Sequence, residues 1–230
     1  SDGGGASAAV GVVENQTAVT TVGATDANGD TLGYSISGGA DRDKFSIDAA
    51  TGVLSFVSAP DFEAPGDSDG NNSYEVEVTV ADGNGGTDLQ AVTVTVTRAA
   101  APVLTAGNDT PVLSAGIDTV KADATNVLNA GDVIDGRGGA DTLEISAAQT
   151  VVLGAATLTH VETVRITAGI QDITTGDATV AAGGTLTVDA SASIDALAWN
   201  GGAETDGRFS IGGGGAADVI TGGAGNDTLA

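Results

Sequence analysis

Residues 74–97 read YEVEVTVADGNGGTDLQAVTVTVT and contain two alternating runs, Tyr74–Val80 and Leu89–Thr97. In both runs valine alternates with threonine or glutamate over several residues, so one face of each strand is apolar and the other is polar. This period of two is typical of antiparallel strands that have one buried face and one solvated face. The segment between the runs, Asp82-Gly83-Asn84-Gly85-Gly86, consists of residues that turns favour. The stretch therefore predicts part of an antiparallel β-sandwich.

The residues that precede this stretch also alternate between strand-like runs and turns. Further strand-like runs lie at 18–24, 32–36, 45–47 and 53–57, separated by turn sequences such as Asn28-Gly29-Asp30 and Thr51-Gly52. The chain is 41% hydrophobic, which is too much for a disordered polymer even though it contains 36 glycines. We therefore expect an all-β fold, with one sandwich over residues 1–98.

The charge of the chain restricts its partners. Acidic residues outnumber basic ones 31 to 7, for a formal net charge of −24. Such a chain lacks the basic footprint that nucleic acid requires, and no run of 18 apolar residues is present for membrane insertion. Most of the acids are aspartates beside Gly and Asn, and short carboxylates in such turns are suited to a hard cation. We therefore expect Ca²⁺ as the bound ion. Because Cys is absent, the sequence offers no disulfide or thiolate metal site.

Several segments of the first hundred residues resemble a cadherin repeat, in the order and with the spacing of that family. They are Glu14-Asn15, Ala24-Thr25-Asp26-Ala27-Asn28-Gly29-Asp30, Asp61-Phe62-Glu63 and Val80-Ala81-Asp82-Gly83. The resemblance implies a Greek-key sandwich that binds Ca²⁺ at both ends. It also implies two sets of ligands, which are Glu14, Asp61 and Glu63 at the C-terminal end and Asp26, Asn28 and Asp82 at the opposite end.

The linker departs from the cadherin pattern. It reads Arg98-Ala99-Ala100-Ala101-Pro102, without the acidic residues that complete the calcium cluster in that family. The loop Asp67-Ser68-Asp69-Gly70-Asn71-Asn72 offers oxygen atoms at alternating positions, as calcium loops often do. We expect Asp67 and Asp69 to complete the site of Glu14, Asp61 and Glu63.

Residues 103–230 have a different composition, which is rich in Ala, Gly and Thr. The segments GGGAADVIT (213–221) and GGAGNDTLA (222–230) are two consecutive nine-residue units of the form G-G-x-G-x-D-x-U-x, where U is a large aliphatic residue. They resemble the repeats-in-toxin family, in which a Gly-rich turn binds Ca²⁺ and a short strand follows. The resemblance implies that Asp218 and Asp227 are calcium ligands in a parallel, β-roll-like solenoid. We expect both chain ends to be cut points in a longer polypeptide.

Looser units of the same kind occur earlier in this part of the chain. The segment 132–143, DVIDGRGGADTL, has the same order of turn and aliphatic residue, which makes Asp132, Asp135 and Asp141 further candidate ligands. Together with the strand-like residues 160–164, it resembles the β-solenoid regions of S-layer and other large bacterial surface proteins. A second sandwich over 103–210 is the competing architecture.

We expect no enzymatic activity. His160 is the only histidine, and no G-x-S-x-G nucleophile motif is present. The expected function is that of a calcium-dependent structural or adhesive segment of a secreted bacterial surface protein, such as an S-layer, a biofilm-matrix protein or a giant adhesin. Its expected location is extracellular, after type I secretion, and its expected partners are other copies or neighbouring domains of the same protein, with cell-surface glycans as a further class. The alternative is a carbohydrate- or ice-binding module.

Overall fold

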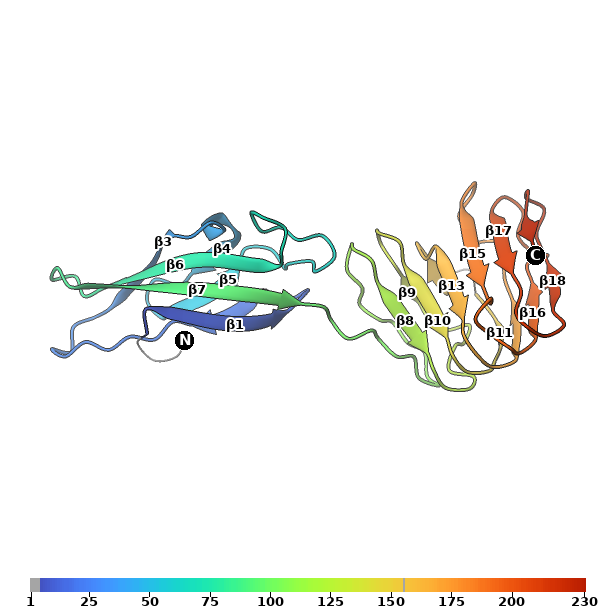
Figure 1. Cartoon of the computed structure of the whole chain (residues 1–230), viewed down its shortest axis with the longest axis horizontal. Coiled ribbons are helices and arrows are strands. Elements are labelled where there is room, and N and C mark those ends of the chain that lie inside the picture. Colours follow the sequence, from blue (N-terminus) through green and yellow to red (C-terminus); the bar gives the residue numbers. More distant parts are fainter. Residues whose placement is uncertain (1–4, 155) are drawn as a thin grey trace. The chain divides into compact units, whose positions relative to one another are not determined.

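The computed structural model describes residues 5–154 and 156–230, and it divides into two compact units at Ala99 and Ala100 (Figure 1). Both units are built of β-strands. The helical element in the described residues is one 3₁₀ turn, η1 (Arg42–Lys44). Within these residues, no helix has the length and apolar character needed to cross a bilayer.

The first unit is a sandwich of two sheets. The larger sheet has the order β1-β7-β6-β3, and the smaller one has the order β2-β5-β4. All pairs are antiparallel except β1 with β7, which run parallel from Ser7↔Ala91 to Val13↔Thr97. The strands are β1 (Ser7–Val13), β2 (Ala18–Thr21), β3 (Gly33–Gly38), β4 (Phe45–Ile47), β5 (Val53–Phe56), β6 (Ser73–Ala81) and β7 (Thr87–Thr97).

The alternation in β6 and β7 gives the first unit its core. Val76, Val78, Val92 and Val94 are buried because every second side chain of a strand points to the same face. Three aromatic rings fill the space between the sheets, and the hydroxyl of one of them, Tyr74, accepts a hydrogen bond from the Gly66 N–H at 2.9 Å. The predicted sandwich is confirmed.

The second unit is a parallel β-solenoid, so the competing prediction of a second sandwich is wrong. Its main sheet has the order β19-β17-β15-β13-β10-β8, a second sheet has the order β11-β14-β16-β18, and β9 pairs with β12. The strands of the main sheet are β8 (Thr119–Ala122), β10 (Thr142–Ile145), β13 (Thr163–Ile166), β15 (Thr185–Asp189), β17 (Arg208–Gly212) and β19 (Thr228–Leu229). The others are β9 (Ile134–Asp135), β11 (Gln149–Val152), β12 (Leu158–Thr159), β14 (Gln171–Thr174), β16 (Leu197–Asn200) and β18 (Val219–Thr221).

Aliphatic side chains from successive turns stack inside the solenoid. The edge-to-face pair Trp199 and Phe209 lies among them, with a ring-centroid distance of 5.9 Å. Two buried glutamines, Gln149 and Gln171, donate their amide N–H groups to backbone carbonyls at the bends after β8, before β11 and before β14. These bonds give the two buried side-chain amides hydrogen-bond partners.

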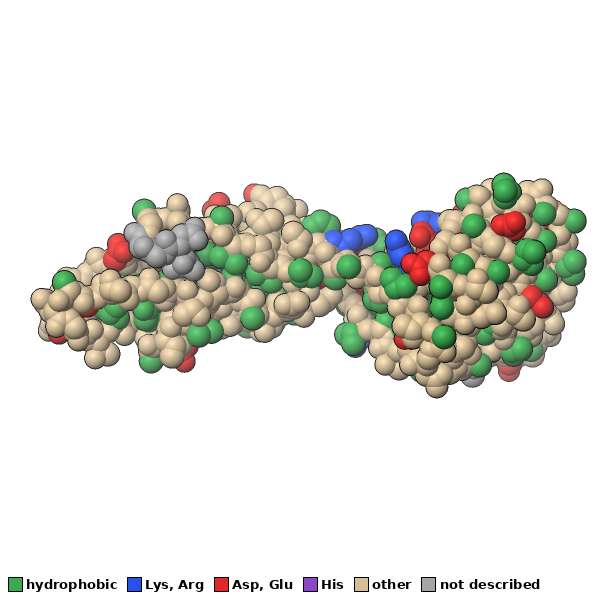
Figure 2. Space-filling view, turned by 90° about the horizontal axis from the view of Figure 1, so that it is seen from below, with side chains coloured by type: hydrophobic (Ala, Val, Ile, Leu, Met, Phe, Trp, Pro, Cys, Tyr) green, Lys and Arg blue, Asp and Glu red, His purple; other side chains and the backbone are tan. Residues whose placement is uncertain are grey.

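Charged side chains of both signs occur on the surface of the second unit. On the face that Figure 2 shows, Lys and Arg side chains lie beside Asp and Glu side chains. Apolar side chains are scattered over that face and do not form one continuous patch.

Candidate metal sites

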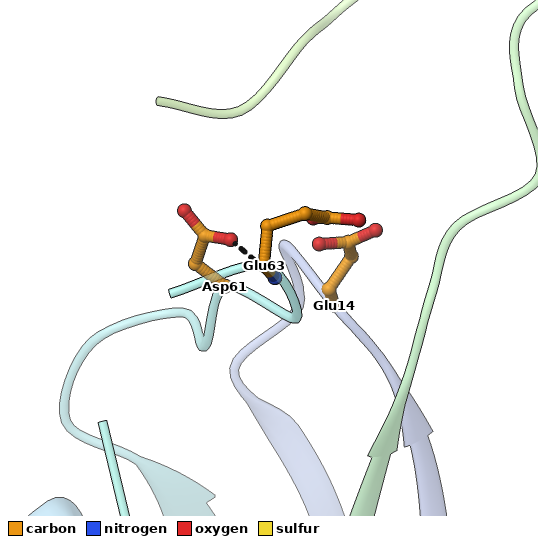
Figure 3. A group of neighbouring side chains, drawn as sticks. All are labelled: Glu14, Asp61 and Glu63. Atoms are coloured by element: carbon orange, nitrogen blue, oxygen red, sulfur yellow. Dashed lines mark hydrogen bonds between the residues drawn. The ribbon is translucent and has the colours of Figure 1, made fainter. Parts of the chain in front are cut away.

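Three carboxylates meet near the end of β1. Glu14 follows β1 directly, and Asp61 and Glu63 lie in the loop after β5. One carboxylate oxygen of each residue lies within 4.8 Å of the other two. Figure 3 shows the carboxylates of Glu14 and Glu63 pointing toward each other, with Asp61 beside them. We call Glu14, Asp61 and Glu63 the first acid group.

Backbone N–H groups hold two of these carboxylates in place. Glu14 is 3% exposed, and its two oxygens accept hydrogen bonds from the N–H groups of Phe62 at 3.0 Å and Ala99 at 2.7 Å. Asp61 accepts from the N–H groups of Glu63 at 2.9 Å and Ala64 at 3.1 Å. The loop after β5 and the chain after β7 therefore fix the carboxylates of Glu14 and Asp61.

Glu63 is the least satisfied member of the first acid group. Burial raises its pKa above the usual range, and the neighbouring Glu14 carboxylate adds to this, while hydrogen bonding to Arg98 opposes it. Oε1 of Glu63 binds the Arg98 guanidinium. Oε2 is buried without a hydrogen-bond partner, and an orphaned carboxylate oxygen of this kind is a ready ligand for a cation.

A second set of carboxylates gathers in the turns before β3 and after β6. Asp26, Asp30 and Asp82, which we call the second acid group, each offer an oxygen within 4.8 Å of the others. Asp26 accepts from the N–H groups of Asn28 at 2.7 Å and Asp30 at 3.0 Å, and these bonds, that of Asp30 first, lower its pKa. Asp82 accepts from the N–H groups of Asn84 and Gly86 in the turn between β6 and β7.

Space for a ligand adjoins the second acid group. Asp26, Asp82 and Asp88 line an open hollow of about 330 Å³ together with residues 23–25, Leu32, Val80 and residues 86–87. Asn28 is exposed, and its N–H group donates to Asp26.

The two acid groups lie at opposite ends of the sandwich. Glu14 follows Val13, which pairs with Thr97 at the end of β7, whereas Asp82 follows Ala81, which pairs with Thr87 at the start of β7. Two oxygens that bind one Ca²⁺ at about 2.4 Å can be at most about 4.8 Å apart, so the spacing in both groups fits this ion. The hard oxygen donors fit it as well.

The loop 67–72 does not join the first acid group as we expected. Asp67 is buried and accepts hydrogen bonds from the N–H groups of Asn71 and Asn72 in its own loop. Asp69 is exposed and accepts from the Asn71 side chain. Among the described residues, neither carboxylate belongs to a metal-sized group, because the loop closes on itself through short-range hydrogen bonds.

The candidate ligands of the solenoid are engaged with backbone N–H groups. Asp132 is buried and accepts from the N–H groups of Asp109 and Asn129, and buried Asp141 accepts from that of Asp118. Asp135 forms an ion pair with His160 at 2.8 Å. In the described part of the solenoid, these acids form no metal-sized group, so the geometry shows them joining one turn to the next.

Asp218 and Asp227 join the turns in the same way. Asp218 accepts from the N–H groups of Leu197 and Gly214, and Asp227 accepts from that of Phe209. In each repeat the carboxylate also lies over the glycine five residues earlier. A Cβ on Gly213 would lie 2.2 Å from Asp218 Oδ2, and one on Gly222 would lie 2.3 Å from Asp227 Oδ2. The repeating glycine therefore leaves room for the carboxylate.

Sequence reasoning missed two residues of these sites. Asp30 belongs to the cadherin-like segment 24–30 but is not named there as a ligand, although its alternation with Asp26 and Asn28 is a usable signal. Arg98 enters the sequence analysis only as part of a linker that lacks acidic residues. Its pairing with Glu63 has a weaker signal, because it depends on how the loop after β5 folds back toward the end of β7.

The first unit matches a known protein family. Residues 9–97 match the cadherin domain. The match covers the two-sheet sandwich and all six residues of the two acid groups. A cadherin domain is consistent with an extracellular adhesive module, and the second unit is a β-solenoid.

Solved cadherin structures are similar to part of the chain. Drosophila N-cadherin EC1-3 is 20% identical with a TM-score of 0.34, and the match covers 41% of this chain and 32% of that one. Human protocadherin-24 EC1-2 is 23% identical with a TM-score of 0.31, covering 40% and 39%. Protocadherin gamma B2 domains 3-6 is 21% identical with a TM-score of 0.33, covering 40% and 20%. A search of the curated proteins finds no match.

Proposed function

We propose that this chain is a calcium-dependent structural and adhesive segment of a large secreted bacterial surface protein. The observation that carries the proposal is the convergence of three carboxylates at each end of the cadherin domain. Bound Ca²⁺ would supply positive charge at these two points. The calcium ions would rigidify the ends of the domain and favour the folded state outside the cell.

The two acid groups differ in the partners of their carboxylates. In the first acid group, Glu14 and Asp61 are fixed by backbone N–H groups, while Glu63 shares its charge with Arg98. Arg98 therefore competes with the ion for Glu63. In the second acid group, no hydrogen bond or ion pair among the described residues joins Asp26, Asp30 or Asp82 to a Lys or Arg. We expect the second acid group to bind Ca²⁺ more tightly.

We further propose that the chain has no enzymatic activity and acts at the cell surface. The single histidine, His160, follows β12, is exposed and is paired with Asp135. The repeats at 213–230 support export of the protein by a type I system, and an S-layer, a biofilm matrix and a giant adhesin are the settings in which such a segment would act. Other copies of the protein are the proposed partners.

The alternative of ice binding has one matching feature. The outward face of the main solenoid sheet carries one threonine from each of several adjacent strands, including Thr142 and Thr163. The next outward column, however, holds charged residues such as Glu144 and Arg165. A regular hydroxyl array would need a second column of threonines, so this face favours a protein partner.

Calcium titration with matched variants tests the proposal. We expect added Ca²⁺ to raise the melting temperature of the wild-type chain, because the ion binds the folded state. Asp82→Asn should remove most of the effect of the second acid group, and Glu63→Gln should remove that of the first. Asp172→Asn changes the charge equally on the exposed face of β14 and is the control. Calorimetric titration that detects no Ca²⁺ binding at millimolar concentration would refute the proposal.

A further inference from the structure

The outward face of the main solenoid sheet carries two straight columns of side chains. Parallel pairing places equivalent residues of neighbouring strands side by side. The first column consists of hydroxyl residues from all six strands: Thr119, Thr142, Thr163, Thr187, Ser210 and Thr228. The second column, two residues further along the strands, is a charge row of Lys121, Glu144, Arg165 and Asp189.

The charge row alternates in sign from strand to strand. Two of the seven basic residues of the chain stand in it, each beside an acid in the strand register. Along the row, Arg165 Nη1 lies 3.8 Å from Glu144 Oε2. Arg165 is exposed, and the other three side chains are half-buried against their neighbours. The row ends at Gly212 on β17, which has no side chain.

A row of signs plus, minus, plus, minus is complementary to its own reverse. A second copy can be turned by 180° about an axis that runs parallel to the strands, midway between β10 and β13. Lys121 then faces Asp189 of the second copy, and Glu144 faces its Arg165. The same rotation sets the hydroxyl column against itself, with Thr142 opposite Thr163. All four facing pairs in the charge row are of opposite sign.

We propose that this face of the solenoid binds a second copy of the chain as a two-fold symmetric pair. Such a contact uses the same patch on both partners and closes on itself. The alternating charges fix the register, since a shift by one strand sets like charges opposite each other. The threonine hydroxyls, which both donate and accept hydrogen bonds, suit a flat contact between identical surfaces.

The size of the face sets the strength of the contact. Four strands at about 4.8 Å spacing and four residues at about 3.3 Å each give roughly 250 Å² per copy. Stable interfaces bury about 800 Å² per partner, so the contact is weak and acts where copies are held close together. It uses none of the residues of the two acid groups, so it stands or falls independently of calcium binding.

Analytical ultracentrifugation tests the pair. We expect the wild-type chain to dimerise reversibly as its concentration is raised to about 1 mM, and to do so equally with chelator and with calcium. Glu144→Lys places like charges opposite each other at both central pairs, and it should weaken the dimer at least about tenfold. Asp172→Lys makes the same charge change on the other sheet and should leave the dimer unchanged. All samples are compared at one salt concentration, since salt also screens the repulsion between two chains of net charge −24.

A variant with the inverted row gives the sharper test. Lys121→Asp, Glu144→Arg, Arg165→Glu and Asp189→Lys together keep the alternation and reverse every sign. We expect this variant, with its β signal in circular dichroism intact, to pair with itself as the wild type does and to pair more weakly with the wild type. The reason is that a mixed pair has opposite charges only when shifted by one strand, at three facing pairs and not four. A wild-type chain that is monomeric at 1 mM would overturn the proposal. Equal weakening by Asp172→Lys, or mixed pairs as stable as the pure ones, would overturn it as well.

Discussion

Asp141 illustrates how the solenoid uses a single carboxyl group. It is 2% exposed, its Oδ1 accepts a hydrogen bond from the Asp118 N–H at 2.7 Å, and its Oδ2 has no partner. Burial raises its pKa to about 6, and the carboxylates of Glu162, Asp118 and Asp135 add to the shift, while the bond from Asp118 opposes it. The folded protein therefore holds this proton more tightly than the unfolded chain does.

The sign of this shift predicts a pH dependence. A raised pKa in the folded state means that stability is lost as the pH rises from about 4 to about 6 and then stays constant. The loss is at most roughly 3 kcal/mol for a shift of about two units. Asp141→Asn keeps the oxygen that accepts from Asp118 and should remove this loss. Urea unfolding in chelator at pH 4.5 and 7.5 measures the effect, with Asp172→Asn as control. A variant that is less stable than the wild type at pH 7.5 would contradict the assignment.

At the residue scale, motif spacing pointed to five of the six members of the two acid groups, because those residues follow a family pattern. The partners of Asp67 and Asp69 could not be predicted. Whether such an acid binds its own loop or a distant site depends on the loop conformation, and a run of Asp, Gly and Asn permits both. The same holds for Asp132 and Asp218, since nothing in the sequence tells a backbone N–H partner from an ion.

At the scale of the element, the glycine before each acidic turn limits what the solenoid tolerates. A Cβ on Gly136 would lie 2.0 Å from the His160 carbonyl oxygen and 2.2 Å from Asp141 Oδ2. Backbone cannot yield as a flexible side chain does. We expect Gly136→Ala to destabilise the second unit by about 1–3 kcal/mol. Gly212, whose Cβ would meet nothing within 4 Å, provides the control. Urea unfolding of Gly136→Ala and Gly212→Ala measures the free energy of unfolding of each variant. Equal stability of the two variants would refute the prediction.

Strands were predictable where alternation is strict, as in 74–80 and 89–97. The register of the solenoid was not predictable. The turns between successive strands differ in length and composition, so the alignment of Thr142 with Thr163, and with it the charge row, appears only when the strands are stacked. The end repeats showed the type of fold, while the looser turns before them did not show where each strand begins.

For the whole molecule, the placement of the acid groups predicts an unequal response to calcium. Both groups lie in the first unit, whereas Asp218 and Asp227, the candidate ligands in the solenoid's end repeats, accept hydrogen bonds from backbone N–H groups. We expect two calorimetric transitions, of which calcium raises the one that belongs to the cadherin domain. Asp82→Asn identifies this transition, because it should lower the calcium shift of that one alone. A calcium shift confined to the other transition would mean that ions bind the solenoid.

The parallel pairing of β1 with β7 has a mechanical consequence. The chain enters the first unit at the start of β1 and leaves it at the end of β7, and the two strands are paired from Ser7↔Ala91 to Val13↔Thr97. Tension on the polypeptide would therefore pull the strands past each other along their length. All the hydrogen bonds between them would carry the load together and would not open one after another. Such a sandwich resists stretching, because the paired strands can separate only by sliding past each other as a unit.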